Sequence, residues 1–136
     1  MPTTAPLSNV RVLVVDDDTD SRELAMLLLT VAGATVEGAE SAAQGYELLK
    51  SWHPDVLVSD IAMPDEDGLS LLRRVRSLSA SEGGRVPALA LSAYADEDDR
   101  RRGFDSGFDE YIAKPANPTK LTSIVARLAV AHASGG

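Results

Sequence analysis

Residues 56–64 read Val-Leu-Val-Ser-Asp-Ile-Ala-Met-Pro: an apolar run, a single aspartate, and a proline soon after. A short apolar run bounded by turn signals is typical of a buried strand in a parallel sheet. Asp60 would then lie at the carboxyl end of that strand, where open α/β sheets place their ligand sites. A lone aspartate there proves little unless other polar groups reach the same edge.

The composition is that of one soluble globular domain. With 136 residues the chain can bury a core, and its hydrophobic fraction of 44% and charged fraction of 25% are ordinary. No apolar run approaches the roughly 20 residues of a membrane span, and residues 1–9 do not resemble a signal peptide. The absence of cysteine fits a reducing compartment, so we expect a cytoplasmic location. The net charge of −8 argues against direct nucleic acid binding.

The rest of the chain alternates between strand and helix patterns. Besides residues 56–59, strands are predicted at residues 10–15, 35–39, 88–91 and 111–113. Helices are predicted to begin at residues that cap helix N-termini: Asp20, Ser41, Asp67, Asp96 and Asn117. This alternation predicts an α/β fold, a doubly wound five-stranded parallel sheet with helices on both faces.

The pattern also sets the expected boundaries and the least ordered parts. We expect one domain over residues 10–131, with flexible segments at residues 1–9 and 132–136. Residues 77–85 are small and polar and predict a mobile loop. The first helix carries an apolar stripe at helical spacing, formed by Leu24, Leu27, Leu28 and Val31.

Polar residues gather where the strands end. The first strand ends at Asp16-Asp17, the third at Asp60, the fourth at Ser92 and the fifth at Lys114. Right-handed crossovers bring these ends to one edge of the sheet. Each residue alone has a simpler explanation, because acidic runs cap helices, serines occur in turns and lysines are mostly solvated. The evidence is the coincidence of four strand ends.

Three carboxylates this close repel one another, and a hard divalent cation such as Mg²⁺ relieves the repulsion. We expect Asp16 and Asp17 to hold the metal, with Asp17 the better candidate for a direct ligand. The Ala62 backbone carbonyl could add an oxygen. Asp60 is then the natural nucleophile, forming an aspartyl-phosphate, while Ser92 and Lys114 can contact phosphate oxygens.

These motifs, in this order and spacing, resemble the receiver domain of two-component response regulators. The resemblance covers residues 10–128 and rests on Val-Val-Asp-Asp-Asp at 14–18, Ser-Asp-Ile-Ala-Met-Pro at 59–64, Asp-Gly at 67–68, Leu-Ser-Ala at 91–93 and Tyr-Ile-Ala-Lys-Pro at 111–115. It implies the flavodoxin-like strand order 2-1-3-4-5. It also implies that Asp60 accepts a phosphoryl group from a sensor histidine kinase or a histidine phosphotransfer protein.

The same resemblance assigns further roles. It implies Mg²⁺ bound by Asp16, Asp17, Asp60 and the Ala62 carbonyl. Ser92 matches the switch hydroxyl, Lys114 the phosphate-pairing lysine and Tyr111 the switch aromatic, and the Lys114-Pro115 bond is usually cis in the family. Phosphorylation would draw Ser92 toward the phosphoryl group and turn Tyr111 inward, changing the surface of the fourth helix, fifth strand and fifth helix.

The resemblance implies a signalling module that catalyses only its own phosphorylation and dephosphorylation. An unidentified downstream protein would bind the changed surface. The resemblance also allows a homodimer that forms on phosphorylation. A stand-alone regulator and the receiver of a hybrid histidine kinase would look alike. Ser92 is shorter than the threonine common at its position. Ala62 and Tyr94 lie where the family varies and are expected to tune the lifetime of the phosphoryl group.

Two other readings of the acidic residues are weaker. A haloacid-dehalogenase-like phosphatase also uses an aspartyl-phosphate and Mg²⁺, but its Asp-x-Asp-x-Thr/Val element fails here because Asp20 occupies the last position. A calcium-binding loop starting at Asp16 would need glycine at its sixth place and glutamate at its twelfth, where Ser21 and Leu27 stand. His53 and His132 are expected to be isolated, so a separate protein must supply the phosphoryl group.

Overall fold

The computed structural model describes residues 5–135 of the chain. Five strands form one parallel sheet: β1 (Arg11–Val15), β2 (Thr35–Ala39), β3 (Val56–Ser59), β4 (Ala88–Ser92) and β5 (Glu110–Ala113). Their order across the sheet is β2-β1-β3-β4-β5. The predicted fold class and strand order are therefore confirmed.

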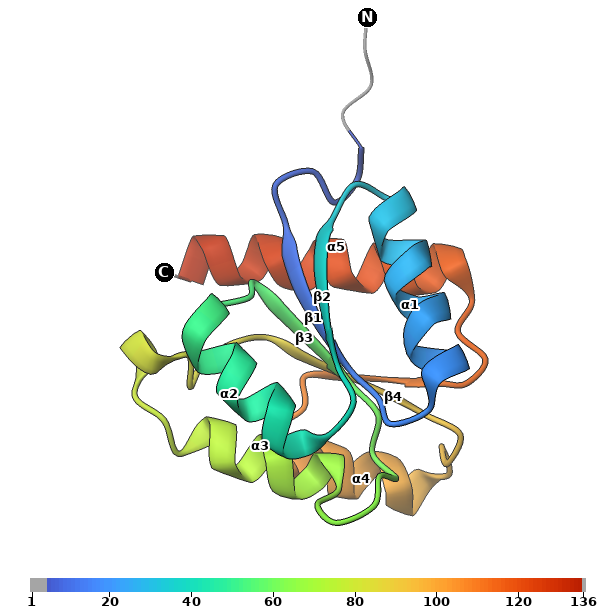
Figure 1. Cartoon of the computed structure of the whole chain (residues 1–136), viewed down its shortest axis with the longest axis vertical. Coiled ribbons are helices and arrows are strands. Elements are labelled where there is room, and N and C mark those ends of the chain that lie inside the picture. The colour runs from blue at the N-terminus through green and yellow to red at the C-terminus, as the bar shows by residue number, and fades with distance from the viewer. Residues whose placement is uncertain (1–4, 136) are drawn as a thin grey trace, which may run out of the picture.

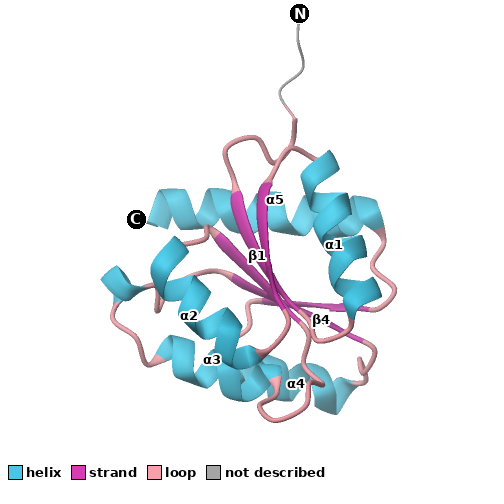
Figure 2. Cartoon of the chain, in the orientation of Figure 1, coloured by secondary structure: helices cyan, strands magenta, loops and turns pink. Residues whose placement is uncertain are grey.

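Helices cover both faces of the sheet (Figures 1 and 2). They are α1 (Thr19–Val31), α2 (Ala42–Trp52), α3 (Gly68–Arg76), α4 (Glu97–Ser106) and α5 (Pro118–Gly135). One apolar core joins the sheet to α1 and α5, with Leu29 and Leu121 fully buried. The other joins it to α2 and α3, and Leu49 and Leu72 are buried in it. Two buried faces explain why the central strands read as continuous apolar runs.

The predicted helix starts are correct except for the first. Ser41, Asp67, Asp96 and Asn117 each accept a hydrogen bond from the backbone N–H three residues ahead. At the first helix the capping residue is Asp18, whose carboxylate accepts from the Ser21 N–H at 2.8 Å, so the expected cap at Asp20 is wrong. In a run of acidic residues, the one with an extended backbone becomes the cap, and sequence alone does not identify it.

The apolar stripe predicted for α1 is also wrong in part. Ala25 and Leu29 are the fully buried residues of this helix. Leu24, Leu27 and Val31 are 49%, 59% and 77% exposed, which leaves an apolar surface on α1. Apolar residues occur on several sides of this helix, so helical spacing alone allowed more than one choice of buried face.

The N-terminal segment is packed in its described part. The Leu7 side chain is fully buried, and its backbone N–H donates to the Ala32 carbonyl at 2.9 Å. Gly33 follows with a φ of +106°, and a Cβ built there would lie 2.6 Å from that of Ala5. Residues 5–9 therefore differ from the flexible segment predicted for residues 1–9, whereas residues 1–4 lie outside the described part. At the other end, α5 continues to Gly135, so the predicted tail is helical up to that residue.

The segment predicted as a mobile loop has local structure. It contains a 3₁₀ turn, η1 (Ala80–Glu82), closed by a capping box between Ser79 and Glu82. The Arg76 guanidinium donates to the carbonyls of Gly84 and Val86 at 3.0 and 2.6 Å, which ties the end of the segment to α3. Among residues 5–135, no helix is both long and apolar enough to cross a membrane.

Candidate functional site

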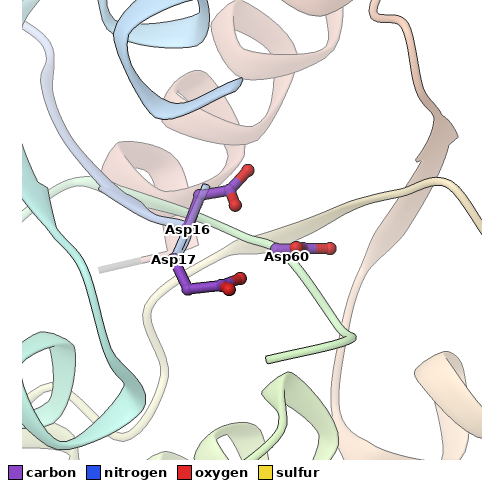
Figure 3. A group of neighbouring side chains, drawn as sticks. All are labelled: Asp16, Asp17 and Asp60. Carbon is purple, nitrogen blue, oxygen red and sulfur yellow. The ribbon is translucent and has the colours of Figure 1, made fainter. Parts of the chain in front are cut away.

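The acidic residues meet where β1 and β3 end. The carboxylates of Asp16, Asp17 and Asp60 each offer an oxygen within 4.8 Å of the others, and Figure 3 shows the three side chains side by side. Asp16 and Asp60 are buried, at 2% and 7% exposure, whereas Asp17 is the most exposed of the three. The structure thus brings together the three carboxylates that the sequence placed at one edge.

Lys114, directly after β5, contacts two of these carboxylates. Its ammonium donates to Asp16 Oδ2 at 2.8 Å and lies 3.4 Å from Asp60 Oδ2. Burial alone would lower the pKa of Lys114, but the two carboxylates outweigh that effect and raise it. Burial, followed by the charge of Asp16, raises the pKa of Asp60 from its ordinary 3.8 to about 6, although Lys114 and the Ile61 N–H oppose the change. The site therefore carries a carboxylate whose negative charge is poorly compensated in the absence of a bound cation.

Ser92 and Tyr111 are connected through the peptide groups of Tyr94. The buried Ser92 hydroxyl oxygen accepts from the Tyr94 N–H at 3.1 Å. The Tyr111 hydroxyl donates to the Tyr94 carbonyl, and the Tyr111 ring is 3% exposed. Burial raises the pKa of this phenol. The ring is thus inside the protein in this structure, and the Ser92 hydroxyl lies close enough to the Tyr111 hydroxyl to oppose that rise.

Two residues near the site carry contacts that the sequence did not indicate. Gly68, noted only as part of a helix start, packs so closely on the loop after β3 that a Cβ there would lie 2.2 Å from the Asp60 carbonyl oxygen. Arg22 on α1 donates from Nη1 to the Asp16 carbonyl oxygen at 2.9 Å. The Asp-Gly spacing could have pointed to the first contact, but the sequence has no signal for the second.

The remaining predicted residues lie as follows. Ala62 is exposed in the loop between β3 and α3, two residues after Asp60. The Lys114–Pro115 bond is cis, as the resemblance implied. His53 is exposed, as predicted, and both it and His132 line a cavity of about 260 Å³ at the opposite edge of the sheet. Neither histidine lies near Asp60.

The donor set at this edge suits Mg²⁺. Mg²⁺ binds hard oxygen ligands and commonly uses a few carboxylates together with waters or phosphate oxygens. The three carboxylates have the required convergence, and Asp17 is open to solvent on one side. Two of them are buried, and burial together with the charge of Asp16 raises the pKa of Asp60, so a nearby cation would stabilise the ionised form. The residues present therefore fit a divalent cation.

Comparison with known proteins agrees with this geometry. Residues 12–126 match the response regulator receiver domain family. The chain belongs to this family. It is 43% identical over 125 residues to an uncharacterized 14.6 kDa protein of Leptolyngbya boryana, covering 92% of this chain and 94% of that one. It is 41% identical over 107 residues to response regulator MprA of Mycobacterium ulcerans, covering 79% of this chain but only 44% of the relative.

Solved structures give the same result. The crystal structure of a response regulator receiver domain protein from Methanospirillum hungatei superposes with a TM-score of 0.85, at 27% identity, and covers 95% of this chain and all of that chain. Receiver domains are signalling modules of two-component systems, and the predicted family is therefore confirmed. Family membership favours the receiver reading over the phosphatase and calcium-loop readings of the same acidic residues.

Proposed function

We propose that this receiver domain is controlled by phosphorylation of Asp60, with a sensor histidine kinase or a histidine phosphotransfer protein as the donor. The observation that carries the proposal is the placement of Asp60 beside two further carboxylates, those of Asp16 and Asp17, and beside the ammonium of Lys114. Asp60 is the carboxylate at the end of the central strand, 7% exposed, with Oδ1 held by the Ile61 N–H at 2.8 Å. That hydrogen bond limits rotation of the carboxylate.

The reaction transfers one phosphoryl group from an imidazole nitrogen of the donor protein to a carboxylate oxygen of Asp60. A carboxylate oxygen of Asp60 forms a bond to phosphorus while the bond from phosphorus to the donor's imidazole nitrogen breaks, and that nitrogen keeps the electron pair and takes a proton. The product is an acyl phosphate on Asp60, which water later hydrolyses to aspartate and inorganic phosphate. Asp16, Asp17, Asp60 and the Ala62 carbonyl would hold Mg²⁺, which supplies positive charge to the phosphoryl oxygens.

Two side chains near Asp60, those of Lys114 and Ser92, would each contact one oxygen of the phosphoryl group. Lys114 would exchange part of its contact with Asp16 for a phosphoryl oxygen, to which it is a natural partner. Ser92 would donate its hydroxyl proton to another phosphoryl oxygen. The Ser92 oxygen and the Tyr111 hydroxyl both hydrogen-bond to the backbone of Tyr94, in the loop between β4 and α4. A movement of Ser92 would therefore shift this loop and, with it, the hydrogen bond that holds Tyr111.

The surface that would change is formed by α4, β5 and α5. Phe104 on α4 and Tyr94 in the loop before α4 are 46% and 61% exposed, and such aromatic residues are suited to contact a protein partner. A downstream protein, or a second copy of the domain, would bind this surface in one phosphorylation state more tightly than in the other. We place the domain in the cytoplasm and assign it no direct contact with nucleic acid.

The apolar surface on α1 supports the choice of donor. Leu24 and Leu27 are largely exposed on that helix, and a cavity of about 220 Å³ lined by Leu24, Leu28 and Pro115 opens beside Lys114. An exposed apolar patch next to a reaction centre is a natural docking place for the protein that brings the phosphohistidine. We therefore assign this surface to the phosphodonor protein.

The test is intact-mass spectrometry after incubation with a small-molecule phosphodonor and Mg²⁺. The wild type should gain the mass of one phosphoryl group, and Asp60→Asn should gain none. Asp65→Asn, which changes an exposed carboxylate in the following loop, should be modified like the wild type. Equal modification of the wild type and Asp60→Asn would show that Asp60 is not the acceptor.

A further inference from the structure

The loop between β1 and α1 carries Asp16 and Asp17. Hydrogen bonds hold this loop at both the backbone N–H and the backbone carbonyl of Asp16. The Asp16 N–H donates to the Ala39 carbonyl on β2 at 3.0 Å. On the other side, the Asp16 carbonyl oxygen accepts from Arg22 Nη1 at 2.9 Å. The Asp16 carboxylate is held as well, because its Oδ1 accepts from the Asp18 N–H at 3.0 Å.

The hydrogen bond from Arg22 acts on Asp17 through the peptide plane. The carbonyl of Asp16 and the N–H of Asp17 belong to one planar group, so holding the oxygen fixes the direction in which the chain enters Asp17. Asp17 is the most exposed of the three carboxylates. No hydrogen bond to the Asp17 carboxylate from another described residue is present to orient it, so its position depends on the backbone.

The Arg22 side chain is itself held in place. It is half-buried, and its Cδ passes over Gly38 of β2, where a Cβ would lie 3.5 Å from that carbon and 2.6 Å from Met26 Sδ. Its backbone N–H also donates to the Asp18 carbonyl at 2.9 Å. None of the ion pairs among residues 5–135 includes Arg22, so its guanidinium is directed to a carbonyl rather than neutralised by a carboxylate.

We propose that Arg22 is a positioning residue that orients Asp17 for Mg²⁺ by hydrogen bonding to the Asp16 carbonyl. This inference rests on the proposed function, because it concerns the metal site of that function. It makes a prediction opposite to that of simple electrostatics. Removing a nearby positive charge should by itself strengthen cation binding, whereas loss of the hydrogen bond should weaken it by leaving Asp17 less well oriented.

The test is a Mg²⁺ titration followed by the amide signals of residues 16–18 and 60–62 in NMR spectra. Arg22→Met keeps the length of the apolar stem and removes the donors, and it should bind Mg²⁺ about tenfold more weakly. Arg22→Lys can still donate to the carbonyl and should recover most of the affinity. Arg101→Met makes the same charge change on the exposed face of α4 and should bind Mg²⁺ like the wild type.

A second readout needs no metal. In EDTA, the Asp17 and Asp18 amides of Arg22→Met should exchange with solvent faster than those of the wild type, while amides in the centre of β1 should not change. Unchanged or tighter Mg²⁺ binding by Arg22→Met, or no recovery in Arg22→Lys, would overturn the role of Arg22 while the metal site stands. Absence of Mg²⁺-dependent shifts in the wild type would instead overturn the metal site, and the inference with it.

Discussion

The ammonium of Lys114 donates its shorter contact, 2.8 Å, to a carboxylate oxygen of Asp16. Its distance to Asp60, the candidate phosphoacceptor, is longer at 3.4 Å. Without phosphate or metal, Lys114 therefore acts mainly as the counter-charge of a buried metal-ligand candidate. A phosphoryl group on Asp60 would compete with Asp16 for this ammonium, so that Lys114 would connect the chemical step to a local rearrangement.

Replacement of Lys114 by alanine should separate phosphorylation from switching. We expect Lys114→Ala to accept a phosphoryl group on Asp60 when Mg²⁺ is present, because the nucleophile and the metal ligands remain. The phosphorylation-dependent amide shifts along Tyr111 to Ala129 should be lost, whereas Lys120→Ala, which removes an exposed lysine of α5, should keep them. Wild-type shifts in phosphorylated Lys114→Ala would contradict this role.

Asp60→Asn should stabilise the metal-free protein in a pH-dependent way. The folded state raises the pKa of Asp60 from 3.8 to about 6, so the folded protein holds this proton more tightly than the unfolded chain does. Ionisation of Asp60 therefore costs stability as the pH rises from about 4 to about 6, and the cost is fully present at pH 7. We expect Asp60→Asn to be about 2 kcal/mol more stable than the wild type at pH 7 in EDTA.

Urea unfolding at pH 7 and at pH 4.5 checks this expectation. The stability difference between Asp60→Asn and the wild type should shrink at the lower pH, where the wild-type carboxyl is protonated in the folded state. Mg²⁺ should also reduce the difference, because it would stabilise only a site with an intact Asp60. A difference that is equal at both pH values would show that the gain comes from another source.

The fold could be predicted in detail because each strand and helix has a local signal. Apolar runs ending in polar residues marked the strands, and Ser41, Asp67, Asp96 and Asn117 marked four helix starts correctly. The carboxylate cluster followed from topology, since parallel strands with right-handed crossovers bring their carboxyl ends to one edge. The sequence was therefore sufficient to predict that the three carboxylates lie close together.

What could not be predicted depends on contacts between distant segments. The buried face of α1 depends on which side meets the sheet, and spacing did not distinguish Leu24 from Ala25. Leu7 is buried where its backbone N–H donates to the carbonyl of Ala32, which lies beyond β1 and α1 in the sequence. The contact of Arg22 with the Asp16 carbonyl involves a backbone acceptor. Because every residue has a backbone carbonyl, the residue types gave no indication of this contact.

Gly68→Ala should impair phosphorylation by displacing the acceptor. The new Cβ would lie 2.2 Å from the Asp60 carbonyl oxygen, so the backbone of the loop after β3 has to move. We expect a loss of about 2 kcal/mol in the free energy of unfolding and at least a tenfold slower phosphorylation, because misplacement of a nucleophile by about 1 Å is costly. Intact-mass spectrometry of samples quenched at successive times gives the rate of phosphorylation of the folded protein.

Gly84→Ala is a matched control for this substitution. Its Cβ would lie 2.1 Å from the Leu78 carbonyl oxygen, a clash of the same kind in the segment around η1, which precedes β4 at the opposite edge of the sheet. It should lose similar stability, but its folded fraction should be phosphorylated at the wild-type rate. Equal slowing in both variants would mean that general destabilisation, rather than displacement of Asp60, limits the reaction.

Arg76 should contribute strongly to stability although it lies outside the site. Its guanidinium donates to the carbonyls of Gly84, Val86 and Gly107, with N–O distances between 2.6 and 3.1 Å, and pairs with Asp109 at 3.2 Å. It thereby joins α3 to the segment around η1 and to the turn before β5.

Arg76→Met would leave these part-buried carbonyls without their donor while keeping most of the apolar volume. We expect a loss of about 3 kcal/mol in the free energy of unfolding, since each buried acceptor left unsatisfied costs about 1 kcal/mol or more. Arg101→Met, which removes a guanidinium paired with Asp98 at the exposed surface of α4, should change stability little. Thermal and urea unfolding of both variants measure the difference. Similar stabilities for the two variants would show that water replaces the guanidinium at these carbonyls without cost.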